Sequence, residues 1–536
     1  MNKGNTMAIL QPWRRLALAL GACALTAWAS SGVAADTPKP GGTLRYGTVS
    51  EIVSLDPHVY GGSAWKVLIE ALYSPLAGYD KNGTIVPRLA KSWDQPDART
   101  LVFHLRPDVT FQDGTPVTAD DVKFSLDRIL DPATGATLRS NLQGATVTVV
   151  DAATVKVEKP SPDATMLSVL ALPEAAIVSR KWVQGGANLK LSANGTGPFQ
   201  LKSYEPAVRA NLVRNPHYFV TGQPYLDGVD FRMIKSDDAR VNALRSQSLD
   251  MIDFVPWKDI DVLRRNAGIK IDTAGGAFMS VWFNTSKKPF DDARVRRAVS
   301  YAIDREAVSK AAFFGYGKPI YGAPTPDDSP YYDKALDGTY KRDPAKARAL
   351  LAEAGYANGV DASMVVFQGL GIYTTMAQVV QANLKEVGIN LKLEPVEWAT
   401  LVERKNRGDY ESMIYGVSVK LPDPDAYAYY LGGDSSYWAK PVGYRDPELE
   451  KLLADGRALT DPKARQPIYQ QAEKRILDTS PWVFVSWREQ GQGYLRKVHG
   501  YTQLGGALSE SSPGISLPTM WPVSYTHLTL PTSDLV

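Results

Sequence analysis

The only cysteine of this 536-residue chain is Cys23. Everything after it therefore lacks disulfides, cysteine metal sites and thiol nucleophiles, and a disulfide-rich secreted scaffold is excluded. The five histidines include no pair at the i, i+4 spacing of a helical zinc site, so we expect neither a metal site nor a cofactor. Any chemistry must come from oxygen, amide and aromatic groups. One hydrophobic core does not suffice at this length, and we expect two or three domains.

The charge of the chain is balanced once its first residues are set aside. The first 35 residues hold three basic side chains, Lys3, Arg14 and Arg15, so the rest carries 57 basic and 57 acidic side chains. A balanced chain gives no electrostatic reason to expect nucleic acid or an anionic membrane as a partner. We also expect a monomer.

The first 35 residues have the pattern of a secretory signal peptide. Two arginines precede the apolar run 16–28, and small residues at 33–35 provide a cleavage site. The run is too short to span a bilayer. We therefore expect a periplasmic protein. As an alternative, a lipoprotein box ending at Cys23 would tether the protein through a lipid.

The other end of the chain, 522–536, fits nothing before it. Within it, the segment 524–532 resembles a peptide translated from sequencing-adapter DNA. We interpret 522–536 as an artefactual tail and exclude it from the fold.

The body of the chain predicts a mixed α/β fold. In the first half we expect a strand at 43–48, a helix at 64–76 and a hairpin at 146–158, and Thr118 with Asp121 forms a capping box. In the second half, helices begin at Pro344 and span 375–387 and 398–405, with a strand at 389–396 between the last two. This irregular order of elements excludes a regular barrel.

The chain contains no catalytic motif of a common kind: no nucleophile elbow, no phosphate-binding loop and no dinucleotide fingerprint. Asp423 and Asp425, on either side of Pro424, could act as a glycosidase pair, or form half of a calcium site, or shape a rigid turn. We expect no enzymatic activity, and a secreted hydrolase that uses Asp423 and Asp425 remains the alternative.

Several ordered segments resemble the dipeptide/oligopeptide-binding family of extracellular solute-binding proteins, the receptors of ABC importers. The segments that carry the resemblance are GGTLR (41–45), SLDPH (54–58), VPRLAKSW (86–93), FQDGTPVTADDV (111–122), GTGPF (195–199), FNTSKKPFDDARVRRA (283–298), YAIDR (301–305), GI (388–389) and EW (397–398). The ordered set spans residues 41–520.

The resemblance implies an α/β fold of two lobes joined by two hinge crossings, near 278–284 and 482–487. Lobe I would comprise 41–280 and 488–521 and carry an extra subdomain at 85–195. Lobe II would comprise 285–481.

The resemblance also implies a function. The protein would capture a peptide or a related small solute by hinge closure and deliver it to a permease and ATPase complex at the inner membrane. The same fold also serves receptors for nickel, haem and other non-peptide solutes, so the ligand stays open.

A closed pocket needs aromatic walls and a few orienting polar groups. We expect such groups on the loop before the first helix, at Tyr60, Gly61, Gly62 and Ser63, unless that loop only covers the surface. The other candidates are Trp398, which matches a position that lines the pocket in relatives or else belongs to the core, and Gln368 and Tyr373 on a glycine-bearing loop.

In peptide-binding relatives, an aspartate pairs with the amino terminus of the peptide, and Lys420 occupies the corresponding position here. A cation opposes the binding of an ammonium group. Either Asp423 takes that role, or the ligand is an anionic or neutral solute with Lys420 as counter-charge, or Lys420 faces solvent.

Overall fold

The computed structural model describes residues 37–522 except 50–51, 60–61, 328, 420 and 434–441. The predicted signal peptide with Cys23, and the tail beyond Pro522, lie outside the described residues. Pro522 itself pairs with Val498 in a short antiparallel ladder. The described residues from Pro38 to Pro522 belong to one compact unit.

A large mixed sheet runs through the described part of the chain. Its strands are β1 (Thr43–Thr48), β8 (Phe199–Glu205), β9 (Arg209–Arg214), β10 (Gly228–Met233), β11 (Met251–Val255), β12 (Ile269–Phe283), β13 (Gly317–Pro319), β14 (Val360–Phe367), β15 (Ile389–Val396), β16 (Ser412–Ser418) and β17 (Trp482–Leu495). The order is β15-β14-β16-β12-β17-β11-β1-β10-β9-β8, with β13 paired to β17. The mixed α/β fold is thus confirmed.

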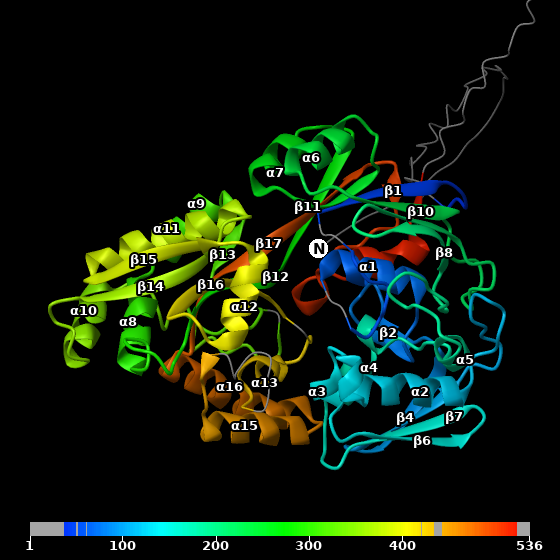
Figure 1. The fold of residues 1–536 in the computed structure, drawn as a ribbon, viewed down its shortest axis with the longest axis horizontal. Helices are drawn as coiled ribbons and strands as arrows, with labels where there is room; N and C mark the ends of the chain where they lie inside the picture. The colour runs from blue at the N-terminus through cyan, green and yellow to red at the C-terminus, as the bar shows by residue number, and fades with distance from the viewer. Residues whose placement is uncertain are drawn as a thin grey trace, which may run out of the picture. The chain divides into compact units, whose positions relative to one another are not determined.

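The two longest strands, β12 and β17, form an antiparallel pair at the centre of this order (Figure 1). Their register runs from Ile269 opposite Leu495 to Trp282 opposite Trp482. On one side of the pair lie β16, β14 and β15, and on the other β11, β1, β10, β9 and β8. The pair occupies the two segments predicted to cross between lobes. Because one ladder continues through both sides, the lobe boundaries at 280–285 and 481–488 stay a prediction.

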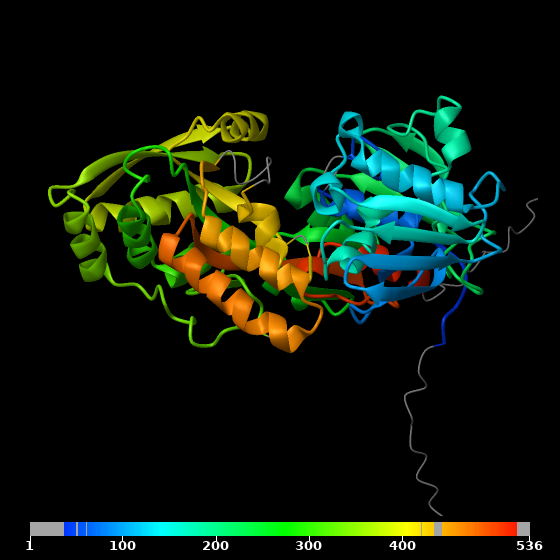
Figure 2. The ribbon, with the colours of Figure 1, turned by 90° about the horizontal axis from the view of Figure 1, so that it is seen from below.

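Smaller sheets accompany the large one. They contain β2 (Ala77–Tyr79) with β3 (Ile85–Pro87), β18 (Val498–His499) with β19 (Trp521–Pro522), and β4 (Ala90–Asp97), β5 (Thr100–Leu105), β7 (Thr154–Glu158) and β6 (Thr146–Asp151) in the order β4-β5-β7-β6. Helix α2 (Ala119–Leu130) packs on β6 and β7 of this last sheet, drawn in blue and cyan in Figure 2. These elements lie within the predicted extra subdomain, 85–195.

Helices surround the sheets. Besides α2, the α-helices are α1 (Ser63–Leu72), α3 (Arg139–Leu142), α4 (Met166–Leu170), α5 (Arg180–Gln184), α6 (Asp237–Arg245), α7 (Trp257–Arg264), α8 (Ala293–Ala302), α9 (Arg305–Phe313), α10 (Pro344–Glu353), α11 (Gly371–Glu386), α12 (Trp398–Arg407), α13 (Ala426–Leu431), α15 (Pro447–Ala458), α16 (Pro462–Thr479) and α17 (Ser512–Ser516). The 3-10 helices are η1 (Pro132–Thr134), η2 (Pro173–Ala175), η3 (Gly506–Leu508) and η4 (Leu517–Thr519).

Local signals set several of these boundaries. The predicted capping box of α2 is confirmed, since the Asp121 amide donates to Oγ1 of Thr118 and the Thr118 amide donates to Oδ2 of Asp121. Asp343 caps α10, accepting from the Lys346 amide at 2.9 Å. The predicted start of α11 at residue 375 is wrong: the helix begins at Gly371.

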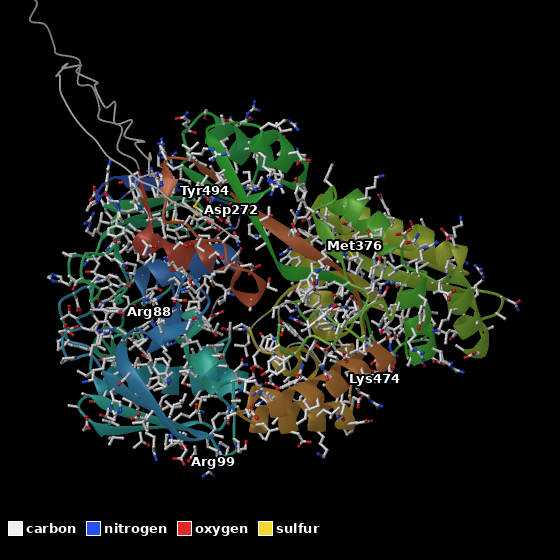
Figure 3. All side chains as sticks on the ribbon, turned by 180° about the vertical axis from the view of Figure 1, so that it is seen from behind. Arg88, Arg99, Asp272, Met376, Lys474 and Tyr494 are labelled. Atoms are coloured by element: carbon white, nitrogen blue, oxygen red, sulfur yellow. The ribbon has the colours of Figure 1, made fainter. Side chains whose placement is uncertain are left out.

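The core follows the large sheet. One apolar cluster includes Trp282, Met376 and Trp482, and a second includes Tyr46 and Trp65. Side chains also join β12 and β17, since the Tyr494 hydroxyl donates to Oδ2 of Asp272 at 2.5 Å; both residues are labelled in Figure 3.

Candidate ligand-binding site

The parallel strands of both parts of the sheet end near the middle of the β12–β17 pair. β14 runs parallel to β15 and β16, and β1 runs parallel to β10 and β11. β16 ends at Ser418, opposite Ala277 of β12, and β11 ends at Val255, opposite Gly491 of β17. Ala277 in turn lies opposite Arg488. We call the region around Ala277 and Arg488 the crossing centre. Open α/β sheets bind ligands outside the carboxyl ends of their parallel strands, which here converge on the crossing centre.

A cavity of about 360 Å³ lies beside the crossing centre. Phe278 of β12 and Trp482 and Phe484 of β17 contribute aromatic lining. Chain segments from both sides of the strand pair complete the wall, namely Asn82, Gly83, Pro324, Thr325, Pro326, Ser329, Pro330, Val419, Leu421, Pro422, Asp423, Pro424, Ala426, Tyr427, Tyr430, Leu504, Gly505, Gly506, Ala507 and Leu508. The lining is thus mainly apolar and aromatic, as a pocket for a small solute requires.

A row of aromatic rings connects this cavity with α12. Trp482 stacks on Trp282 with 4.4 Å between ring centroids, and Trp282 lies 4.5 Å from Tyr415. Trp398 follows at 5.7 Å from Tyr415, while Tyr430 lies 5.6 Å from Trp482. Trp398, at 42% exposure, is the open end of the row rather than part of the core.

The two carboxylates after β16 are held in ion pairs. Asp423 accepts two hydrogen bonds from Arg465, each 2.8 Å long. Asp425 accepts from Arg457 at 2.8 and 3.2 Å and from the Tyr469 hydroxyl at 3.2 Å. Burial raises the pKa of Asp425 to about 6, against the opposing effect of Arg457. Although Asp423 lines the cavity, its charge is already neutralised, so the structure gives no support to the hydrolase alternative or to Asp423 as an anchor for ammonium.

A polar network reaches the cavity wall from α16. Oγ1 of Thr325 lies 3.0 Å from the hydroxyl of Tyr427, and both hydroxyls donate to Glu473. Burial raises the pKa of Glu473 to about 7, since it is 1% exposed, and the two hydrogen bonds oppose that rise. The network holds a titratable group directly behind the cavity.

Tyr373 and Gln368 lie apart from the cavity lining. Tyr373 is buried in the first turn of α11, not on a loop, because its ring packs against Phe367 and Trp398. Burial raises the pKa of Tyr373, an effect that nearby Arg488 opposes. Gln368 is exposed and donates to Glu397 at 2.7 Å.

The structure describes only some of the other predicted site residues. Tyr60, Gly61 and Lys420 lie outside the described residues. Gly62 is exposed and precedes α1 with a φ of 119°, a conformation that favours glycine, and Ser63 is the first, buried residue of the helix. Neither lines the cavity.

Our sequence reasoning missed Arg488, which lies at the crossing centre. A signal was present in the sequence: after the mainly apolar run 482–487, polar residues stand at the alternate positions Arg488, Gln490 and Gln492, although Glu489 lies between the first two. Such alternation places three polar side chains on one face.

The family comparison gives a decisive match. The model of "Bacterial extracellular solute-binding proteins, family 5 Middle" matches residues 84–438, more than half of the chain. The chain belongs to this family. The family is one of binding proteins rather than enzymes, and its members work with the permease and ATPase of ABC importers.

Individual relatives cover nearly the whole chain. AgaA of A. tumefaciens R10, solved in complex with agropinic acid, has a TM-score of 0.84 and 34% identity and covers 91% of this chain and 100% of its own. The glutathione-binding protein GsiB of Pectobacterium atrosepticum is 26% identical over 84% of this chain and 90% of its own length. Heme-binding protein A of Haemophilus influenzae is 27% identical over 91% and 96%. The two-lobe fold of periplasmic binding proteins is thereby confirmed, while the ligands of these relatives differ.

Two further features concern the described residues only. Among them, no group of three or more histidine, cysteine, aspartate or glutamate side chains is placed to hold a metal ion. None of the helices between residues 37 and 522 that the structure describes combines the length and apolar character needed to cross a bilayer.

Proposed function

We propose that this protein is the periplasmic substrate-binding protein of an ABC importer. It is exported by its first 35 residues, captures a small solute at the crossing centre and delivers it unchanged to a permease and ATPase complex. It acts as a monomer and catalyses no reaction. The observation that carries this proposal is the convergence of parallel strands from both parts of the sheet on one aromatic-walled region.

Binding of the solute between the two parts of the molecule explains why the hinge would close. Side chains from both sides of the β12–β17 pair surround the cavity, so a bound solute contacts both. Contacts present only in the closed form shift the population toward it. A micromolar ligand provides about 8 kcal/mol of binding free energy, from which closure must be driven.

The solute class is narrowed by the charges near β16. Arg465 neutralises Asp423, so this carboxylate is not free to hold the amino terminus of a peptide. Lys420 stands at the position where an anionic partner of that terminus would be needed. We therefore favour a non-peptide, anionic or neutral solute over a peptide with a free amino terminus. AgaA, with its agropinic acid, supports this class.

Native mass spectrometry of the protein purified from periplasm tests the function, followed by calorimetric titration with agropinic acid, glutathione and heme. We expect one small molecule retained at a 1:1 ratio, or micromolar binding of one of the three. Absence of any retained or titrated solute, or turnover of one of them by the purified protein, would contradict the proposal.

A further inference from the structure

Arg488 is a nearly buried arginine whose guanidinium makes no hydrogen bond to any described residue. Its side chain is 11% exposed, and its Nε is buried without a partner. The nearest carboxylate oxygen, Oε1 of Glu510, is 3.8 Å from Nη2, beyond hydrogen-bond distance. That oxygen already accepts from Ser418 at 2.7 Å. The donors of Arg488 are therefore left for a group that the protein itself does not supply.

A buried Nε without a partner among the described residues also occurs at Arg240 and Arg297, but two other buried arginines donate repeatedly to backbone carbonyls. Arg296 donates to backbone carbonyls through all three guanidinium nitrogens, at 2.6 to 3.1 Å. Arg305 donates from Nε and Nη1 to three carbonyls at 2.9 Å. These arginines stabilise the fold, whereas Arg488 lacks such partners. A buried donor without a partner has a free-energy cost that selection tolerates chiefly at functional sites.

Two amides extend the unsatisfied face of β17. The side-chain oxygens of Gln490 and Gln492 are buried and have no hydrogen-bond partner. Gly491 and Gly493, which alternate with them, face the opposite way, toward Val255. The two amide oxygens thus share one face of the strand with Arg488.

The backbone of β16 passes close to Arg488 at a glycine. A side chain at Gly416 would collide with the Tyr373 hydroxyl at 2.9 Å and would reach Nη1 of Arg488 at 3.7 Å, so a glycine here keeps the approach open. The ring of Phe254 lies 6.0 Å from the guanidinium carbon. Tyr373 belongs to α11 and Phe254 to β11, which lie on opposite sides of the strand pair.

We infer that the solute carries a carboxylate that Arg488 binds. The solute also carries hydroxyl or N–H groups that donate hydrogen bonds to the side-chain oxygens of Gln490 and Gln492. This inference rests on the proposed function. A guanidinium matches a carboxylate in two parallel hydrogen bonds. A single arginine with Glu510 nearby favours a monoanion over a phosphate dianion, because the Glu510 carboxylate repels additional negative charge.

Binding measurements on Arg488→Met and Arg488→Lys test the inference, with Arg407→Met on the exposed end of α12 as the matched control. The probes are agropinic acid, glutathione, their carboxamide derivatives and inorganic phosphate. We expect the wild type to bind one of the carboxylate probes. The carboxamide of that probe, and inorganic phosphate, should bind to the wild type at least 100-fold more weakly. Arg488→Met should lose at least 100-fold in affinity for the carboxylate probe. Arg488→Lys should lose less. Equal affinity of Arg488→Met and wild type for that probe, or preference for phosphate, would overturn the inference while leaving the proposed function intact.

A second measurement needs no ligand. Thermal unfolding of the ligand-free proteins should give a higher melting temperature for Arg488→Met than for wild type, because the variant removes a nearly buried guanidinium that makes no hydrogen bond to a described residue. Arg407→Met should cause no change. A lower melting temperature would assign Arg488 a structural role and overturn the inference. If the wild type bound no probe at all and also retained no solute from the periplasm, the proposed function would fail, and the unfolding result would still decide the role of Arg488.

Discussion

Buried charged side chains of this protein differ in their hydrogen-bond and ion-pair partners, and this difference separates structural from functional residues. Asp423 and Arg465 form a closed pair with two hydrogen bonds of 2.8 Å. Glu473 is buried and accepts hydrogen bonds from two hydroxyls, but no cation among the described residues pairs with it. Arg488 has no hydrogen bond to a described residue and only the Glu510 carboxylate nearby, at 3.8 Å. The first pair shapes a turn, while the other two groups remain sensitive to pH or ligand.

Glu473 predicts a pH dependence of stability. Its folded-state pKa of about 7 exceeds its ordinary value of 4.5, so the folded protein holds this proton more tightly than the unfolded chain does. The contribution to stability is full below pH 4.5 and is lost as the pH rises through 7. We expect a loss of roughly 3 kcal/mol over that window, at about 1.4 kcal/mol per pKa unit. Chemical denaturation between pH 4.5 and 8 measures it.

Glu473→Gln should remove only the share of Glu473 in the total loss, because the amide keeps the acceptor oxygen for Thr325 and Tyr427 but does not ionise. Burial also raises the pKa of Asp425 and of Glu70, so these two groups keep their own shares. The exposed Glu448→Gln is the control and should follow the wild type. A slope that is as steep in Glu473→Gln as in the wild type would show that Glu473 does not contribute.

Lys420 predicts a charge effect on binding. Lys420→Asp should weaken an anionic ligand at least tenfold, because a counter-charge is replaced by a like charge, with cooperative unfolding retained. Calorimetry with the ligand found by mass spectrometry measures the change, and Lys420→Arg should bind nearly as well as wild type. Unchanged affinity in Lys420→Asp would mean that Lys420 faces solvent.

At the scale of elements, the β12–β17 pair is shaped by a glycine in β12. The register shifts between Gly275 and Ala277, and η3 packs there. A side chain on Gly276 would come within 2.0 Å of Oγ of Ser509 and 2.2 Å of the Gly506 carbonyl oxygen. Only a residue without a side chain allows the segment that lines the cavity to approach this strand.

Gly276→Ala should therefore destabilise the protein by about 1–3 kcal/mol, the usual range for overpacking. The neighbouring Gly275→Ala is a matched control, since its added methyl group would meet no atom within 4 Å. Urea unfolding of both variants measures the difference. Equal stability of the two would show that η3 shifts without cost.

Sequence patterns predicted the elements that local signals specify. The strands at 43–48 and 389–396 appear at the predicted residues, and Thr118 caps α2. The start of α11 was missed because burial of Ile372 and Tyr373 outweighs the low helix propensity of Gly371.

The site was harder to predict because its partners are distant in the chain. Arg465, which neutralises Asp423, is 42 residues away, and no local pattern reveals that pairing. Tyr373 and Trp398 were both predicted, and their rings lie 6.5 Å apart, but neither lines the cavity. Arg488 was overlooked, although the alternation of polar residues in β17 was visible in the sequence.

At the scale of the whole molecule, the proposed function requires the parts on either side of the β12–β17 pair to move toward each other when the solute binds. Saturating amounts of the bound solute should lower the radius of gyration, because contacts to both parts favour the closed form. Small-angle scattering measures the change, and Arg488→Met at the same solute concentration should keep the larger value. An unchanged profile for the wild type with a verified ligand would exclude hinge closure.

The unbroken ladder of the large sheet limits how this protein can be dissected. Residues 285–481 expressed alone would retain β16 without β12, and the remainder would retain β12 without β16. Each fragment would then present an unpaired strand edge, a template for association with other chains. Truncation would consequently give aggregation-prone pieces, so the receptor has to be manufactured, and engineered, in one piece.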